Sequence, residues 1–314
     1  SLYVSVPLCF FVLLCIRHHS LPPHRKSCSI ATMASTAAPS LEHVSIEVQS
    51  DGIAVLRFEH PERLNSMDVA MVTDARAALS WAALNPSVRA LVVTGRGRGF
   101  CAGAYLGESG SSGVGESAGS VVYQNMRTSW NLFGMDLKHF PKPTIAVVNG
   151  PAAGAGFGIA LLTDVTIAAK STYFLLPFVP TLGISPDVGS TWHVGRQLPR
   201  GFGLPLALLG PRLPAPDAQA RGLIWEAVED SKLWDRGMEL AKQLAALPRT
   251  SVLLVREAID AAPKNSLADQ LHLEADNQRQ LFDDSESKAV MAKTAKQFRD
   301  AAARRTQKGK AAKL

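Results

Sequence analysis

Short apolar runs alternate with longer helical stretches through the middle of the chain. Two β-rich runs, Val44–Val48 and Ile53–Phe58, flank Ser50-Asp51-Gly52, which predicts a hairpin. Val69–Leu84 follows Asp68, a suitable N-cap, and carries Ala and Leu at helical spacing. Continuous apolar runs too short for helices then recur, as is typical of buried strands, at Ala90–Thr94, Thr144–Val148 and Val165–Ala168. This order of strands and helices predicts an α/β fold with a mainly parallel core.

The pattern changes near residue 233 and is helical almost to the end of the chain. The helices expected there are Trp234–Leu247, Ser251–Ala262, Leu267–Phe282 and Lys288–Ala303. We therefore divide the chain into an N-terminal extension (1–40), a core (41–232) and a helical region with a basic tail (233–314). Gly107–Gly119 is rich in Gly and Ser, which predicts a mobile surface loop.

The 314 residues are 46% hydrophobic and 19% charged, a globular composition that excludes collagen-like and disordered chains. The net charge of +6 suggests nucleic-acid binding at first, but most of it lies at the two ends. Residues 287–314 carry a net +8 and residues 1–32 a net +3, which leaves about −5 for residues 33–286. A mildly acidic body removes the main argument for a nucleic-acid partner.

The two ends carry possible targeting signals. Leu2–Ile16 is apolar but shorter than a membrane helix and has no preceding base, so we predict no membrane span. Residues 1–32 precede Met33, and we interpret them as upstream sequence, with an organelle presequence as the alternative. Ala312-Lys313-Leu314 is a near variant of the peroxisomal Ser-Lys-Leu address, which predicts an import receptor as partner and a peroxisomal location. A mitochondrial or cytoplasmic location is the alternative.

Two glycine-rich segments follow predicted strands. Gly95–Leu106 reads GRGRGFCAGAYL and Asn149–Ala160 reads NGPAAGAGFGIA. Strand-to-helix turns of this kind direct free backbone N–H groups towards a ligand, and two of them together could form an oxyanion hole. A dinucleotide loop is the alternative for the first segment, but no acidic residue ends a following strand to support it.

A third segment, Leu182–Thr191, reads LGISPDVGST and places Asp187 in a turn. A turn aspartate commonly caps a helix, so a structural role and a chemical role remain equally open from these residues alone. His193 follows six positions later, and we expect a packed or surface residue there rather than a substrate contact. Cys101 is expected to be a small buried residue, and no disulfide framework or metal site is predicted for the body.

Four ordered motifs together resemble the enoyl-CoA hydratase/isomerase, or crotonase, superfamily over roughly residues 41–300. They are HPERLNSM (60–67), GFCAGAYL (99–106), KPTIAVVNGPAAGAGFGIALLTD (142–164) and LGISPDVGSTW (182–192). The resemblance implies a spiral of ββα units and a helical C-terminal region that forms trimers, often paired into hexamers. It also implies an acyl-CoA substrate, with coenzyme A entering as part of the thioester and no separate cofactor.

The resemblance also implies roles for individual residues. Backbone N–H groups of Ala104 and Ala155 would hold a thioester enolate, and Asp187 would act as acid and base. The substrate would contact residues of the same motifs, namely Arg63, Leu64, Ala102, Tyr105, Leu106, Gly154 and Phe178. Hydratases of the family resemble one another in carrying two glutamates, where this sequence has Gly158 and Phe178.

Without those glutamates, we expect an isomerase that shifts a double bond from 3-enoyl-CoA to 2-enoyl-CoA. The string around Asp187 is most similar to the ring isomerases of phenylacetate degradation and to Δ3,Δ2-enoyl-CoA isomerases. A hydratase-like enzyme, a dehalogenase-like enzyme with Asp187 as nucleophile, and a non-catalytic acyl-CoA binder remain the alternatives.

Overall fold

The computed structural model describes residues 38–105, 107 and 117–311. The chain divides after Met33, and every described residue belongs to the unit 34–314. Residues 1–37, Leu106, most of the predicted mobile loop (108–116) and Ala312-Lys313-Leu314 lie outside the described residues. The division into three segments at residues 40 and 232 stays a prediction.

A six-stranded sheet forms the centre of the fold, in the order β1-β2-β3-β4-β6-β9. Its strands are β1 (Val44–Val48), β2 (Ile53–Phe58), β3 (Ala90–Gly95), β4 (Thr144–Val148), β6 (Val165–Ala169) and β9 (Glu226–Val228). Only β1 and β2 are antiparallel; the other neighbours are parallel. The predicted hairpin of β1 and β2 is thus confirmed. The predicted parallel core is also confirmed, and it forms because buried apolar strands alternate with helices along the chain.

A second, three-stranded sheet has the order β5-β7-β8. It consists of β5 (Ala152–Ala153), β7 (Tyr173–Leu175) and β8 (Leu213–Pro214). An isolated bridge pairs Cys101 with Ala152 of β5. A second isolated bridge, outside this sheet, pairs Ala104 with Met67. This small sheet brings the two glycine-rich segments together.

Helices connect the strands, and several of them pack on the main sheet. The core helices are α2 (Val69–Leu84), α3 (Ala118–Asn125), α4 (Asn131–Lys138), α5 (Ala155–Leu161), α6 (Ser190–Gln197), α7 (Arg200–Leu209) and α8 (Ala215–Ala220). Shorter helical turns are η1 (Pro61–Arg63), η3 (Met126–Trp130), η4 (Phe178–Leu182) and η5 (Asp230–Lys232). Asp68 caps α2 as predicted, since its side chain accepts a hydrogen bond from the Met71 N–H at 2.8 Å. Gly119, assigned to the mobile loop from sequence, instead lies in α3.

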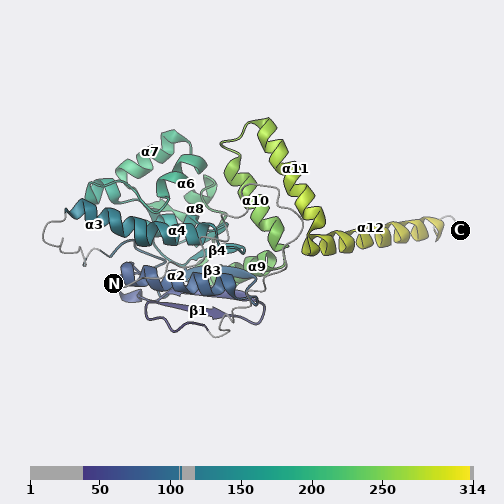
Figure 1. Cartoon of the computed structure of the whole chain (residues 1–314), viewed down its shortest axis with the longest axis horizontal. Coiled ribbons are helices and arrows are strands. Elements are labelled where there is room, and N and C mark those ends of the chain that lie inside the picture. The colour runs from purple at the N-terminus through teal and green to yellow at the C-terminus, as the bar shows by residue number, and fades with distance from the viewer. Residues whose placement is uncertain (1–37, 106, 108–116, 312–314) are drawn as a thin grey trace, which may run out of the picture. The chain divides into compact units, whose positions relative to one another are not determined.

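Two hydrophobic clusters lie on opposite faces of the main sheet, because alternate side chains of a strand point to opposite faces. Val55, Val92 and Ile145 belong to the cluster that packs against α9 (Leu233–Ala245). Leu56 and Val93 belong to the larger cluster with α2 and α4. Figure 1 shows α9 beside β3 and β4. Its buried side chains Leu233, Met238 and Leu240 belong to the cluster on this face of the sheet.

The C-terminal helical region continues with α10 (Arg249–Ala261), α11 (Leu267–Asp283) and α12 (Ser285–Ala311), as the sequence predicted. Arg256 fixes α10 to the core: its Nη2 lies 2.6 Å from Asp164 Oδ2, and its Nη1 donates to the Phe140 carbonyl at 2.7 Å. Within the described part of the chain, no helix is long and apolar enough to cross a bilayer.

Candidate active site

Asp187 lies in a tight turn between η4 and α6. Val188 and Gly189 both adopt left-handed backbone conformations, with φ values of 46° and 76°, and the Ser190 N–H donates to the Asp187 carbonyl at 2.9 Å. The N-cap of α6 is Gly189, and no side chain caps this helix. The alternative role of Asp187 as a helix cap is therefore wrong.

The Asp187 carboxyl group is largely buried, and its Oδ1 atom has no hydrogen-bond partner among the described residues. Burial raises the pKa of Asp187 to about 6, although a hydrogen bond to its own backbone opposes the change. A carboxyl group with a pKa near neutrality can both take and return a proton during one catalytic cycle.

The two predicted glycine turns lie against each other. Gly103 and Gly154 have positive φ values of 98° and 55°. A Cβ atom added at Gly103 would lie 2.9 Å from the Ala153 carbonyl oxygen and 3.3 Å from the Ala155 nitrogen. A Cβ atom added at Gly154 would lie 3.5 Å from the Gly103 Cα. Glycine is required at Gly103 because both its conformation and this backbone contact exclude a side chain.

This contact places two unpaired backbone donors near each other. The neighbouring N–H groups are paired: Tyr105 donates to the Met67 carbonyl at 2.8 Å, and Gly154 donates to the Leu175 carbonyl at 3.0 Å. Within the described residues, the N–H groups of Ala104 and Ala155 donate no such bond. Ala155 is the first residue of α5, where N–H groups lack an acceptor in the helix. Two backbone donors without partners on adjoining turns are the components from which an oxyanion hole is built.

The first turn differs from its prediction in one respect. It was expected to open directly into a helix, as the second turn does. Ala104 instead pairs with Met67 in an isolated parallel bridge, and the next α-helix among the described residues, α3, begins at Ala118. The Ala104 N–H is therefore oriented by strand-like pairing, and only the Ala155 N–H benefits from a helix dipole.

The Asp187 turn packs directly on α5. A Cβ atom at Gly158 would lie 2.2 Å from the Val188 carbonyl oxygen and 3.1 Å from Ser190 Oγ. Gly158 follows Ala155 by three residues, so the turn lies one helical turn from the free Ala155 N–H. The space that a side chain at Gly158 would need is occupied by the turn that carries Asp187.

Phe178 lies at the other position where the resemblance expects a carboxylate. It is 5% exposed, and its ring Cζ would lie 3.8 Å from a Cβ atom added at Gly154. An aromatic ring thus borders the second glycine turn.

Four of the predicted substrate contacts come from two segments that pair with each other. The Ala102 N–H donates to the Leu64 carbonyl at 3.0 Å, and the Arg63 guanidinium lies 4.4 Å from the centre of the Tyr105 ring. Arg63 also pairs with Asp68 at 2.7 Å. Leu106 lies outside the described residues, so its predicted role is untested.

Two asparagines that the sequence analysis missed, the buried Asn65 and the partly buried Asn149, hold these loops. Asn65 Nδ2 donates to the carbonyls of Arg96 and Gly99 at 3.0 and 2.7 Å, and its Oδ1 accepts from the His60 N–H at 2.9 Å. Asn149 Oδ1 accepts from the Gly95 N–H at 3.1 Å. The motif HPERLN contained this signal, because an asparagine that tolerates φ near 56° suits a tight, hydrogen-bonded turn.

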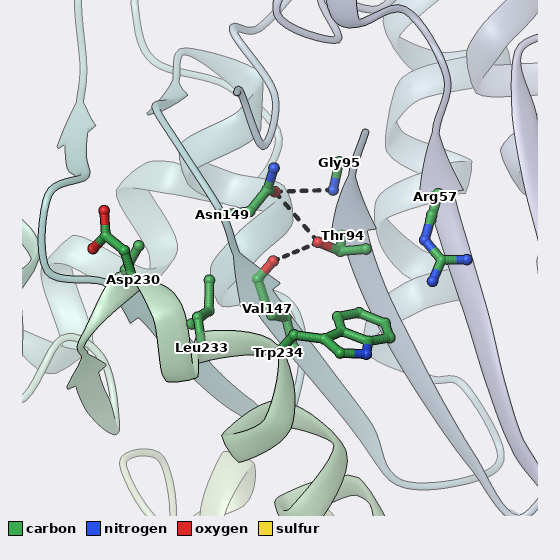
Figure 2. Close-up of a pocket in the computed structure, with 9 residues that line it drawn as sticks. Arg57, Thr94, Gly95, Val147, Asn149, Asp230, Leu233 and Trp234 are labelled. Carbon is green, nitrogen blue, oxygen red and sulfur yellow. Dashed lines mark hydrogen bonds between the residues drawn. The ribbon is translucent and has the colours of Figure 1, made fainter. Parts of the chain in front are cut away.

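A cavity of about 350 Å³ opens at the carboxyl ends of the parallel strands. Figure 2 shows its wall, with Arg57 and Trp234 on one side and Asp230 on the other. Asn149 also lines it, but its side-chain amide is already bonded to Gly95 and Gly97. None of the predicted site residues lines this cavity, and we assign no ligand to it.

Cysteine and metal chemistry find no support at the site. Burial raises the pKa of the Cys101 thiol to about 12, so the reactive thiolate is not formed near neutral pH. In the part of the chain that the structure describes, no three His, Cys, Asp or Glu side chains are grouped as metal ligands would be.

The sequence profile of the family described as enoyl-CoA hydratase/isomerase matches residues 48–301. The chain belongs to this family. A 1,2-epoxyphenylacetyl-CoA isomerase of Escherichia coli (strain K12) is 39% identical over 228 residues, which cover 73% of this chain and 86% of that protein. A probable enoyl-CoA hydratase of Rhodobacter capsulatus is 36% identical and covers 74% of this chain and 87% of its own length.

Solved structures of family members confirm the crotonase fold. An enoyl-CoA hydratase from Polaromonas sp. JS666 superimposes with a TM-score of 0.69 at 28% identity, over 81% of this chain and 97% of its own. An enoyl-CoA hydratase from Bacillus anthracis gives a TM-score of 0.73 at 25% identity, over 81% and 97% of the two chains. The predicted fold class, an α/β crotonase-like spiral followed by a helical region, is correct.

Proposed function

We propose that this family member is an acyl-CoA isomerase that converts 3-enoyl-CoA to 2-enoyl-CoA. In the first step, the Asp187 carboxylate removes a proton from Cα of the acyl group, and the N–H groups of Ala104 and Ala155 stabilise the enolate oxygen. The same carboxyl group then returns the proton to Cγ, which moves the double bond into conjugation with the thioester. The observation that carries the proposal is the Asp187 carboxyl, whose Oδ1 is buried without a partner among the described residues, in a turn that packs against the helix that begins at Ala155.

A second candidate, enoyl-CoA hydratase, is favoured by the similarity to the probable hydratase of Rhodobacter capsulatus. Hydration requires one group to activate water and another to protonate the α-carbon. Gly158 and Phe178 provide neither, and a side chain at Gly158 would meet the Val188 carbonyl at 2.2 Å. This steric argument favours the isomerase, as does the name of the isomerase from Escherichia coli.

The proposed substrate contacts follow from the paired segments described above. Arg63, Leu64, Ala102 and Tyr105 would lie along the coenzyme A part of the substrate. Gly154 and Phe178 border the free Ala155 N–H, and they would contact the acyl group near its thioester carbon. Coenzyme A is then part of the substrate, and the proposed reaction needs no separate cofactor.

We also propose that the helical region assembles the chain into trimers or hexamers. Large apolar side chains of α10 and α11 are exposed in the single chain, including Val255 (59%), Ile259 (69%) and Phe282 (62%). Light scattering of the purified protein tests this proposal, since a monomer would contradict it. The peroxisomal address and its receptor stay predictions. Fluorescence microscopy of the tagged protein with and without Ala312-Lys313-Leu314 tests them.

The function is tested by giving the protein a 3-enoyl-CoA and a 2-enoyl-CoA in separate assays. The proposal predicts conjugation of the first, seen as a rise in ultraviolet absorbance, and no hydration of the second. Hydration of the 2-enoyl-CoA at a comparable rate would favour the hydratase. Binding of both thioesters without turnover would indicate an acyl-CoA binder. Release of halide from a halobenzoyl-CoA would indicate a dehalogenase.

A further inference from the structure

Three buried polar atoms without partners occur at intervals of three residues, starting from the proposed acid and base. They are Asp187 Oδ1, Ser190 Oγ and His193 Nε2, and none has a hydrogen-bond partner among the described residues. Ser190 is 0% and His193 2% exposed. An unpaired buried polar group costs about 1–3 kcal/mol, so three in one short segment indicate a site that uses them.

The backbone holds Ser190 close to Asp187. The Ser190 N–H donates to the Asp187 carbonyl at 2.9 Å, which closes a four-residue turn. The ends of such a turn are less than about 7 Å apart at their Cα atoms. Ser190 Oγ lies on the side of α6 that faces α5, 3.1 Å from the position of a Cβ atom at Gly158. At this separation of the two backbones, a serine hydroxyl and an aspartate carboxyl are within the reach of a direct or a water-mediated hydrogen bond.

A hydroxyl suits a group that changes its protonation state twice in each turnover. It donates a hydrogen bond to a carboxylate and accepts one from a carboxylic acid. An amide or an ammonium group has no atom that can do both. A serine hydroxyl next to Asp187 would therefore have a hydrogen bond to offer before and after each proton transfer.

His193 can support this hydroxyl as a neutral donor. Its Nδ1 lies 3.3 Å from Gln197 Nε2, which donates to it, so the ring proton is on Nε2. Burial lowers the pKa of His193 to about 4, assisted by Lys138 and opposed by Asp260. Lys138 of α4, Asp260 of α10 and Arg196 of α6 are the charged groups that act on it, and α5 has no titratable side chain.

We propose that Ser190 is a positioning residue whose hydroxyl, supported by the His193 Nε2–H, hydrogen-bonds the Asp187 carboxyl in both of its protonation states. The inference rests on the proposed function, because it assigns a partner to the proposed acid and base.

The test compares Ser190→Ala with Ser185→Ala, a control that removes an exposed hydroxyl from the same loop. The pH profile of kcat/KM should show an acidic limb near pH 6 in the wild-type protein, where Asp187 ionises. A hydrogen bond to the charged carboxylate is stronger than one to the neutral acid, so its loss should move this limb up by about one pH unit in Ser190→Ala and lower kcat about tenfold, with KM unchanged. His193→Leu should shift the limb in the same direction by a smaller amount. The control should match the wild type.

A titration without substrate separates this inference from the proposed function. In protein labelled with ¹³C at aspartate carboxyl groups, the signal that disappears in Asp187→Asn identifies Asp187. Its titration midpoint should rise in Ser190→Ala and stay unchanged in Ser185→Ala. An unchanged midpoint and pH profile in Ser190→Ala would overturn the role of Ser190, whatever the activity is. An Asp187→Asn variant with full activity would overturn the proposed function instead.

Discussion

Two polar clusters of this protein differ in how their hydrogen bonds are used. The loop cluster of Asn65 and Asn149 is saturated: Asn65 uses both side-chain amide hydrogens and its oxygen on backbone groups. The turn cluster of Asp187, Ser190 and His193 leaves three buried polar atoms without partners among the described residues. Both clusters come from family motifs, but only one can offer hydrogen bonds to something else.

The comparison separates scaffold from chemistry. A saturated buried amide contributes stability and fixes the loops that carry the glycine turns. A buried carboxyl oxygen without a partner costs stability, and such unpaired groups concentrate where a substrate or a proton completes the site. Changes in the loop cluster should therefore mainly affect stability, and changes in the turn cluster mainly activity.

The largest effect is expected from Asp187→Asn, because it removes the group that moves the proton while keeping its size. The kcat for conjugation of a 3-enoyl-CoA should fall about 10³-fold, within the usual range for loss of a general acid and base. The control Asp217→Asn, an exposed acid at the start of α8, should retain activity. Thermal unfolding monitored by circular dichroism should show that neither variant is destabilised. Residual activity above a tenth of the wild-type value would contradict the proposed role.

Asn65→Ala should have the opposite profile. It leaves the carbonyl of Arg96 and the His60 N–H unpaired, and it places Ala in a left-handed conformation that Asn tolerates better. The free energy of unfolding, measured with urea, should fall by about 3 kcal/mol. Gln243→Ala, which removes an exposed amide, serves as the control and should change it by less than about 0.5 kcal/mol. A loss of activity without a loss of stability in Asn65→Ala would contradict the distinction between the two clusters.

Gly158→Ala tests the contact between the two parts of the site. The added Cβ would lie 2.2 Å from the Val188 carbonyl oxygen, so the Asp187 turn must move away from α5. We expect a fall of about 1–3 kcal/mol in the free energy of unfolding and a loss of most isomerase activity. Gly195→Ala, at a helical position with no atom within 4 Å of the added Cβ, is the matched control and should stabilise the protein slightly. Equal behaviour of the two variants would show that the turn does not depend on Gly158.

A pH-dependent difference in stability is expected between the wild type and Asp187→Asn. The pKa of Asp187 is about 6 in the folded protein against an ordinary value of 3.8, so the folded state holds this proton more tightly than the unfolded chain. Raising the pH from 4 to 6 therefore removes stability from the wild type, by at most about 3 kcal/mol, and not from the variant. The lowered pKa of His193 acts in the opposite direction in both proteins and cancels in the comparison.

Urea unfolding of the two proteins at pH 4, 5, 6 and 7 measures this difference. The variant should be the more stable protein at pH 7, and the two should converge at pH 4. Parallel stability curves would mean that Asp187 ionises normally.

Most of the fold could be predicted from sequence because its signals are local. The apolar runs of β1 to β4 and the N-cap Asp68 predicted the type of each of these elements. The two glycine turns could also be predicted, since Gly103 and Gly154 are needed for conformations that other residues avoid. The largest difference between a predicted and an observed helix boundary is eight residues, at the end of α12, which extends to Ala311 instead of Ala303.

The rest of the site depends on contacts between distant residues. The sequence could not reveal that the Val188 carbonyl fills the space beside Gly158, because these residues meet only after α5 and α6 have packed. For the same reason, nothing in the sequence indicated a role for Ser190, because a serine at the start of a helix is common. The bridge between Ala104 and Met67 occurs where a helix was expected. It could not be predicted, because local periodicity carries no signal for the pairing of two loop segments.

The central claim is that Asp187 takes the Cα proton while the Ala104 and Ala155 N–H groups hold the enolate. It is tested most directly by exchange of the C2 protons of a saturated acyl-CoA in D₂O, followed by ¹H NMR, because such a thioester can form the enolate but cannot isomerise. The account predicts exchange catalysed by the wild-type protein and abolished in Asp187→Asn, with thioester binding retained. Equal exchange rates in the two proteins would contradict it.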